Sequence, residues 1–420
     1  MTSLFMSSIN NGTFENHIKE VSNIIKNELN ILNDKYIQRD RKINITDLFH
    51  FLCHKNGNNN SYNSTNYHFT KSGHFNVSNT AIIKKRKLIK ANEFDSINYE
   101  LLSYIYKDVD IRFLAVDGSQ MNLLKQIIEE DDKKFSLSKS KKFKKGLLSS
   151  IIDIDREIVI NCSIFNHENE RKALEEQLKY IRKGDVLIFD RGYYSKELLE
   201  LLLKKGIGFI FRMIEKNNYC KLLSTTNDLT TEIKIKKTKY PLRIIKYTLE
   251  SSKQRVKIYK KDVIDYEQYY LLTSLIDEEY TLDRFKELYH KRWKVETNFR
   301  YLKYYASLGR INTKTMKFVE QDVSIHNFIF ILTGFFEHLL IEYAKIKNKK
   351  INTKLMLKLI TEDIMIYLVK GEMDAPKLNK IMCLFKILLK FLVPIQKDRH
   401  YKRQTKIPMN EWAHIWAFFK

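Results

Sequence analysis

The sequence predicts a mixed α/β fold, with a central sheet and helical regions toward both ends of the chain, on three observations. In the middle of the chain, apolar β-branched runs typical of buried strands alternate with amphipathic helical stretches. The next segment alternates apolar with basic residues, which is typical of antiparallel strands with one wet face. From Thr281 onward the apolar residues recur at helical spacing. Strands followed by alternating helix and strand imply a sheet with a buried centre.

The composition is that of a folded, strongly basic protein. The chain has 420 residues, with 74 Lys and Arg against 50 Asp and Glu, which gives a net charge of +24 at pH 7. Hydrophobic residues make up 44%, which excludes a wholly disordered chain, and the 12 glycines and 4 prolines exclude collagen-like or proline-rich architectures. A charge of this size indicates a polyanionic partner: DNA, RNA or an anionic membrane surface.

The remaining global features point to the inside of a cell. The four cysteines form no CxxC pair, and the N-terminus lacks a basic segment followed by an apolar one. The most apolar run, Phe328 to Phe336, is well short of the roughly 20 residues that span a bilayer. We therefore expect a soluble protein with no membrane partner. It would lie in the bacterial cytoplasm at the nucleoid, or in the nucleus if the source is a eukaryote or a virus.

The first hundred residues predict helices and one candidate contact with DNA. Residues 1–55 carry apolar positions at helical spacing, and residues 56–66 read as an Asn- and Ser-rich loop. Ser78 is a suitable N-cap for a helix that carries Lys84, Lys85, Arg86 and Lys87. Such a helix could lay basic side chains along a phosphate backbone, although a solvated basic face on a packing helix explains the same residues.

The middle of the chain predicts the sheet and two acidic positions. Apolar runs that read as strands occupy 111–119, 146–154, 157–165, 185–192 and 207–213, with helices at 168–183 and 195–205. Asp117 and Asp190 come at the ends of two of these apolar runs. Charges are costly inside a sheet unless they are paired or bound to metal, and sites assemble at strand ends. Two such aspartates in one sheet therefore indicate a site more strongly than either one alone.

The second half predicts more strands and then helices. Period-2 alternation with Lys and Arg covers 233–239, 242–250 and 255–262, and an apolar strand follows at 269–275. Helical patterns then cover 281–305, 315–346, 351–370 and 376–392, before a basic tail that contains Trp412 and Trp416.

One of these helices carries a pattern of its own. At 100° per residue, Tyr289, Arg292, Glu296 and Lys303 share one narrow stripe about four turns long, beside an apolar face that docks the helix. Arg292 and Glu296 at this spacing form an ordinary surface ion pair as readily as part of a site. Spacing alone does not separate the two interpretations.

These motifs together resemble a known family. The pattern Tyr289-x2-Arg292-x3-Glu296-x6-Lys303 resembles the Y-R-E-K signature of the DDE transposases of insertion sequence family four. AVDGS around Asp117 and DRGYYS around Asp190 resemble the first two acidic motifs of that family. The resemblance covers about residues 105–310. It implies a ribonuclease H-like catalytic core in two parts, 106–213 and 269–310, separated by a β-rich insertion at 214–268. Around this core, residues 1–105 would form a helical DNA-binding region and residues 311–420 a helical region with a basic tail.

The resemblance also implies a function and a set of functional residues. The protein would bind the terminal inverted repeats of its element and carry out metal-dependent DNA cleavage and strand transfer by a cut-and-paste mechanism. Asp117, Asp190 and Glu296 would be the catalytic residues and would hold two Mg²⁺ or Mn²⁺ ions, which prefer oxygen ligands. The residues expected to bind DNA phosphate are Tyr289, Arg292, Lys303 and Arg212. The partners would be double-stranded DNA, both terminal repeats and target, and a second copy of the chain on paired DNA ends.

Two other functions compete with this one. The first is a transposase-derived DNA-binding protein that no longer cuts, against which the intact acidic residues argue. The second is a structure-specific ribonuclease H-like nuclease without strand transfer. The resemblance also implies a hairpin intermediate, assisted by an aromatic residue of the insertion. The insertion has no Trp, and its candidates are Tyr219, Tyr240, Tyr247 and Tyr259.

Overall fold

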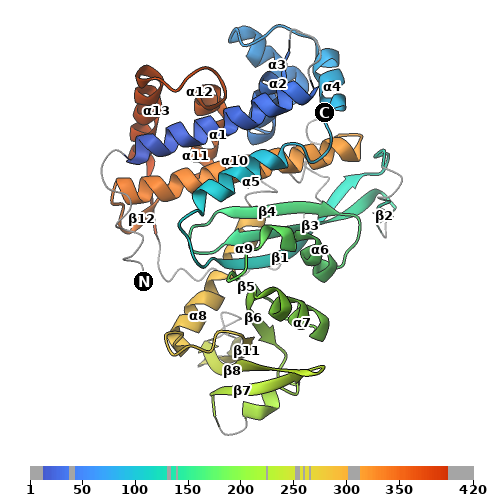
Figure 1. The fold of residues 1–420 in the computed structure, drawn as a ribbon, viewed down its shortest axis with the longest axis vertical. Helices are drawn as coiled ribbons and strands as arrows, with labels where there is room; N and C mark the ends of the chain where they lie inside the picture. The colour runs from blue at the N-terminus through green and yellow to red at the C-terminus, as the bar shows by residue number, and fades with distance from the viewer. Residues whose placement is uncertain are drawn as a thin grey trace.

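A computed structural model describes most of the chain and confirms the mixed α/β class. A central sheet lies below a layer of helices, and the strands β7 and β8 form the opposite end of the molecule (Figure 1). The described residues are 13–36, 43–129, 134–138, 141–223, 226–250, 256–258, 261–263, 266–300 and 313–395. Lys303 and the basic tail with its two tryptophans lie outside them.

The central sheet contains nine strands. Their order is β2-β3-β1-β5-β6-β11-β8-β7, and β4 also pairs with β3, along a different stretch from β2. Their bounds are β1 (Phe113–Leu124), β2 (Ser136–Leu137), β3 (Phe143–Asp153), β4 (Val159–Phe165), β5 (Val186–Phe189), β6 (Gly208–Met213), β7 (Asp228–Ile235), β8 (Thr238–Glu250) and β11 (Tyr266–Thr273). Strand β1 runs antiparallel to β3 and parallel to β5, and β5 runs parallel to β6. Two small two-stranded sheets complete the strands: β9 (Val256–Ile258) with β10 (Lys261–Val263), and β12 (Lys349–Lys350) with β13 (Val393–Pro394).

The parallel centre of the sheet follows from its sequence. All four residues of β5 are buried, as expected for an apolar strand between two neighbours. A parallel neighbour needs a crossover, which helix α7 (Lys196–Lys205) supplies. The Ser195 hydroxyl accepts from the Leu198 N–H and begins α7, and Gly206 ends it at φ 65°, a conformation that glycine adopts without steric cost.

Two of the strands within 214–268, β7 and β8, continue the central sheet, and so does β11, which begins in this range. Strands β7 and β8 form a hairpin, with Lys236 at φ 53° in the turn, and β8 pairs with β11, which pairs in turn with β6. The alternating pattern is visible in the burial of β7, where Ile233 and Ile235 are buried and Lys234 is exposed.

The N-terminal and C-terminal helices form one layer rather than two separate regions. The first group comprises α1 (Thr13–Tyr36), α2 (Ile45–Gly57), α3 (Tyr62–Lys71), α4 (Asn79–Leu88) and α5 (Asp95–Ile105). The second comprises α10 (Met316–Tyr343), α11 (Thr353–Leu359), a π-helical turn (Ile360–Ile364), α12 (Met365–Val369) and α13 (Ala375–Leu388). Helix α10 packs against α2, α5 and strand β4, and α1 packs against α12 (Figure 1). The Asn- and Ser-rich loop is shorter than expected, since Ser61 caps α3 from Tyr62.

Helix α10 lies at the centre of this layer, in contact with helices of both groups. By length and composition it is the one described helix that is long and apolar enough to cross a membrane, and 83% of its most apolar window is buried inside the structure. Gly334 lets it approach the β3–β4 turn, because a Cβ there would lie 2.9 Å from the Glu157 carbonyl oxygen. This burial is typical of a helix in the core of a folded domain.

The helix expected over 281–305 is divided in the structure. Helix α8 (Leu282–Lys291) begins at the N-cap Thr281, and α9 (Lys294–Arg300) follows after a turn at Arg292 and Trp293. Backbone bonds at the turn tighten to i→i+3, from Trp293 N–H to His290 C=O and from Val295 N–H to Arg292 C=O. The prediction of one continuous helix was therefore wrong over the described residues 281–300, and the last member of the predicted stripe, Lys303, lies outside them.

Candidate active site

Asp117 and Asp190 lie level with each other because β1 and β5 are parallel neighbours. The register pairs Ala115 with Ile188, so two residues further along Asp117 comes level with Asp190, the first residue after β5. The expectation that both aspartates end strands was half right. Strand β1 continues to Leu124, since β3 pairs with it along that whole length and sets Ser150 opposite Asp117.

Helix α9 brings Glu296 to the same place. It packs against β1 and β3, and Asn298 Nδ2 donates to Ser150 Oγ at 3.2 Å. Ser150 is the residue that pairs with Asp117, and Asn298 follows Glu296 by two positions, so this bond fixes the Glu296 segment of α9 beside Asp117. The negative charge of Glu296 acts on Asp117 and raises its pKa. The three carboxylates named from the sequence thus lie on neighbouring elements.

Arg292 is buried among these carboxylates. Its side chain is 3% exposed, and its Nη2 lies 3.3 Å from Glu296 Oε1, so the ion pair foreseen from the spacing is present. Burial lowers the pKa of Arg292, but Tyr289, Asp190, Asp117 and Glu296 outweigh it and raise that pKa above its usual value. Its Nε is buried and has no hydrogen-bond partner among the described residues. Arg292 is therefore an ion-pair partner of Glu296 and is also influenced by the charges of Asp117 and Asp190.

Asp117 is held in an unfavourable environment for its charge. Burial raises the pKa of Asp117 to about 6, and Glu170 and Glu296 act in the same direction, against the opposing effects of Arg292 and the Gly118 N–H. That N–H donates to Asp117 Oδ1 at 2.9 Å. A carboxylate that resists ionisation in this way gains most from a bound cation.

Sequence reasoning missed two members of this cluster, Glu170 and Tyr193. Glu170 opens helix α6 (Glu170–Gln177), which packs on β1 and β3, and its side chain lies against Gly118. Tyr193 follows Asp190 by three residues and is 1% exposed. Tyr193 lay within the quoted motif DRGYYS, whereas no local signal marks Glu170, because its position depends on the docking of α6.

Tyr289 and Arg212 belong to an aromatic cluster beside Asp190. The Tyr289 hydroxyl donates to Asp190 Oδ1 at 3.4 Å, a long bond. The Arg212 guanidinium lies 4.2 Å from the Tyr269 ring centroid, and its Nη2 lies 2.5 Å from Glu267 Oε1. Tyr247 stacks on Tyr269 with centroids 5.2 Å apart. Arg212 is 8% exposed and packs among these rings, and its Nε has no hydrogen-bond partner in the described part of the chain, so its role as a phosphate contact stays a prediction.

The basic helix predicted after Ser78 exists as α4, but only part of it faces solvent. Lys84 and Lys87 are exposed, whereas Lys85 and Arg86 are buried. Arg86 is 0% exposed and contacts α10 and α3, where it donates to Gln321 Oε1 (2.8 Å), Tyr62 OH (2.6 Å), the Phe318 carbonyl (2.6 Å) and Asp322 Oδ1 (2.7 Å). The expectation that Arg86 contacts DNA was wrong, because this network removes it from the surface. Burial counts against Lys85 as well.

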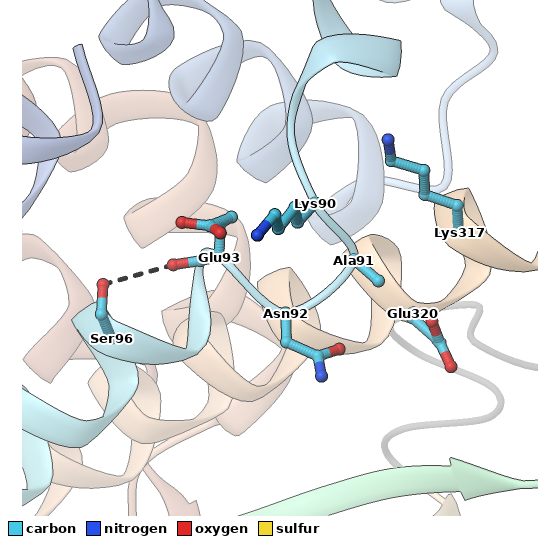
Figure 2. A pocket seen from close by; sticks show the side chains of 7 residues that line it. All are labelled: Lys90, Ala91, Asn92, Glu93, Ser96, Lys317 and Glu320. Atoms are coloured by element: carbon cyan, nitrogen blue, oxygen red, sulfur yellow. Dashed lines mark hydrogen bonds between the residues drawn. The ribbon is translucent and has the colours of Figure 1, made fainter. Parts of the chain in front are cut away.

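A hollow of about 470 Å³ lies away from the carboxylates (Figure 2). It lies between the α4–α5 connection and the first turn of α10. Its lining residues are Lys90, Ala91, Asn92, Glu93, Ser96, Lys317 and Glu320. Two lysines and two glutamates balance its charge, and it contains none of the carboxylate cluster.

The donor chemistry of the cluster fits a hard divalent cation. Carboxylate oxygens are the ligands that Mg²⁺ prefers, and burial, with smaller effects from Glu170 and Glu296, raises the pKa of Asp117. No group of three or more His, Cys, Asp or Glu side chains in the described part of the chain is gathered closely enough to hold a metal ion as it stands. The carboxylates therefore fit a divalent cation by their chemical type and by their positions on adjacent elements.

Comparison with known proteins gives a family and a likeness to solved structures. Residues 108–332, more than half of the chain, match the family described as transposase DDE domain. No curated protein matches the chain in sequence. Among solved structures, it is similar to a piggyBac transposase synaptic complex with hairpin DNA, determined by cryo-electron microscopy. The identity is 11% over 96% of this chain and 90% of that one, with a TM-score of 0.43.

Proposed function

The chain belongs to the transposase DDE domain family, and on that premise we propose that it binds the ends of its own mobile element and moves them by cut-and-paste transposition. In this proposal Asp117, Asp190 and Glu296 are the catalytic carboxylates. The observation that carries it is their arrangement: two aspartates level on parallel strands, and a glutamate on a helix bonded to the strand opposite.

The strand order supports a ribonuclease H-like core for this site. Strands β4, β3 and β1 are antiparallel neighbours in that order, and β5 and β6 follow on the other side of β1, parallel to it. The antiparallel strands β11, β8 and β7 then extend the sheet. This leaves Asp117 on β1 and Asp190 directly after β5, on two adjacent parallel strands, with both side chains partly buried.

The chain's own residues perform three tasks in this mechanism. When bound, divalent cations would activate the attacking oxygen and stabilise the leaving one, held by Asp117, Asp190 and Glu296. Arg292 is buried, charged and bonded through Nη2 to Glu296, so its Nε remains free to donate to a phosphate oxygen. Tyr289 orients the Asp190 carboxylate through its hydroxyl.

The finer features of the proposal come from the resemblance of the motifs. They are membership of the Y-R-E-K group of insertion sequence family four, a phosphate contact by Lys303, a pair of Mg²⁺ or Mn²⁺ ions, and a homodimer on paired DNA ends. Exposed Lys84 and Lys87 on α4 remain available as contacts to the DNA backbone.

Cleavage of labelled DNA carrying the element's terminal repeats tests the proposal. With Mg²⁺ the wild-type chain is expected to cut at the repeat boundary and to join the resulting 3′-hydroxyl end to target DNA. Asp117→Asn, Asp190→Asn and Glu296→Gln should each abolish cleavage while binding to the repeats survives, and Glu175→Gln on the exposed face of α6 is the matched control. Wild-type binding without cutting would favour a derived DNA-binding protein, and cutting without joining would favour a nuclease. Retained cleavage in any of the three variants would remove that residue from the site.

A further inference from the structure

Gly118 and Glu170 fit together closely beside Asp117. A Cβ built at Gly118 would lie 2.6 Å from Glu170 Oε1, 2.7 Å from its Cγ and 2.8 Å from its Cδ. These separations are shorter than real Cβ contacts allow, so the Glu170 side chain occupies the space that any larger residue at position 118 would need. Gly118 follows Asp117 directly, and the Glu170 carboxylate therefore lies at the acidic cluster.

Glu170 acts on both aspartates of the cluster. Its charge raises the pKa of Asp117, and burial together with Asp190 raises its own. A negative side chain at the first turn of α6 is favoured by the helix dipole, but that benefit is equally available to a side chain that faces solvent. Asn169 already caps the helix by accepting from the Arg171 and Lys172 N–H groups. At this place the charges of Asp117 and Asp190 repel that of Glu170, and the hydrogen bond from Tyr193, which lowers the pKa of Glu170, opposes this repulsion only in part, because that pKa stays raised.

Two buried polar groups adjoin the same cluster. The Tyr193 hydroxyl is buried, and burial, the charges of Glu170 and Asp117, and its hydrogen bond to the Glu170 carboxylate raise its pKa. The Arg292 Nε is buried without a hydrogen-bond partner in the described part of the chain. A buried donor without a partner is costly, so the Arg292 Nε indicates an acceptor beside the carboxylates, such as a cation-bound water or a phosphate oxygen.

We propose that Glu170 is a fourth carboxylate of the divalent-cation site, supplied by the first turn of α6, and that position 118 is glycine to admit it. This inference rests on the proposed function, because it adds a residue to the site formed by Asp117, Asp190 and Glu296. It gives Glu170 a direct role toward the cation, with Tyr193 set to hydrogen-bond a carboxylate or a cation-bound water.

Mn²⁺ binding to the purified full-length protein tests this role without measuring catalysis. The loss of the free Mn²⁺ signal in electron paramagnetic resonance gives the affinity at pH 7.5. Glu170→Gln is expected to weaken binding about tenfold or more, the range seen when a residue of a metal site is removed. Glu170→Asp keeps the charge but retracts the carboxylate, and it should weaken binding as well. Glu175→Gln makes the same charge change on the exposed face of the same helix and should bind as the wild type does.

Gly118→Ala provides an independent route to the same loss. The added Cβ displaces Glu170 from its place, so the affinity should fall although every carboxylate is present. Because both changes remove one interaction, the double variant Gly118→Ala, Glu170→Gln should bind no more weakly than Glu170→Gln alone.

The outcomes separate this inference from the proposal beneath it. Wild-type affinity in Glu170→Gln overturns the role of Glu170, and so does wild-type affinity in Glu170→Asp, which would reduce the effect to distant charge. If Asp117→Asn and Asp190→Asn weaken Mn²⁺ binding in the same experiment, the cation site stands and only Glu170 is excluded. If those two variants also bind as the wild type does, the proposed cation site itself fails.

Discussion

Asp117 lowers the stability of the folded chain at neutral pH, and it is also a carboxylate of the proposed cation site. Burial holds its pKa near 6 in the folded chain, above the ordinary value of 3.8. The folded state therefore binds this proton more tightly than the unfolded state does, and the free energy of unfolding falls as the pH rises from about 4 through 6. Above that window the native state carries a poorly solvated charge, which a bound cation would compensate.

Asp117→Asn is expected to stabilise the metal-free protein at pH 7.5. The neutral amide removes the buried charge and keeps an oxygen that accepts from the Gly118 N–H. A gain of about 1–3 kcal/mol in the free energy of unfolding follows from a shift of about two pKa units. Urea unfolding in the presence of a chelator measures it, and the same comparison near pH 4 is the internal control, where the gain should shrink. A variant no more stable than wild type at pH 7.5 would contradict the account.

At the scale of elements, the helical layer depends on one buried ion pair. Arg86 on α4 and Asp322 on α10 are 0% and 2% exposed, and their nearest atoms lie 2.7 Å apart. Lys55 lies 3.9 Å from the other Asp322 oxygen, and Asn56 donates to Asp322 Oδ1. The network ties three helices together, so removing either charge leaves the other one buried and poorly compensated.

Arg86→Met should therefore destabilise the fold by about 3–5 kcal/mol, because Asp322 loses its main partner. Chemical denaturation followed by circular dichroism measures the change. Lys84→Ala on the exposed side of the same helix is the control, with an expected effect within about 0.5 kcal/mol. The double variant Arg86→Met, Asp322→Leu should recover part of the loss. Equal stability of the Arg86 and Lys84 variants would refute a structural role for Arg86.

The contact of α10 with the β3–β4 turn makes a second prediction at this scale. Alanine is about 1 kcal/mol better than glycine in a helix interior, so propensity alone favours Gly334→Ala. The added Cβ would lie 2.9 Å from the Glu157 carbonyl oxygen, however, and the backbone must move. We expect a net loss of about 1–3 kcal/mol, seen as a lower melting temperature. Gly192→Ala, with no atom within 4 Å of the added Cβ, should leave the melting temperature unchanged.

At the scale of the whole molecule, the net charge of +24 is the dominant property. The site carboxylates are negative, so in the proposed function the basic surface is what would hold the DNA around them. Each phosphate neutralised adds about 0.9 to the slope of log affinity against log salt concentration.

Binding to duplex DNA should accordingly weaken steeply with salt. An interface that engages about six phosphates gives a slope near −5. Fluorescence anisotropy with end-bearing oligonucleotides at several KCl concentrations measures it. Lys84→Ala with Lys87→Ala should reduce the slope if α4 touches the backbone, whereas Lys358→Ala, on the exposed face of α11, serves as the control. Binding that is indifferent to salt would break the link between charge and DNA.

The sequence by itself determined the class of fold and most of its elements, because periodicity and capping are local properties. The Ser78 cap of α4, the apolar strand β5 and the long apolar helix α10 could all be predicted in this way. The motifs also named the three carboxylates that the structure places on neighbouring elements.

Only the tertiary structure decided where side chains face and which elements meet. The spacing of apolar residues does not reveal that Arg86 is buried in an ion pair with Asp322 of α10. It also does not reveal that the helix expected from Thr281 divides into α8 and α9 at Arg292. Glu170 is the clearest case, since it reaches Gly118 only because α6 docks on β1 and β3. Its contact joins positions 52 residues apart (170 − 118), and no local pattern encodes such a contact, because its energy comes from packing between elements.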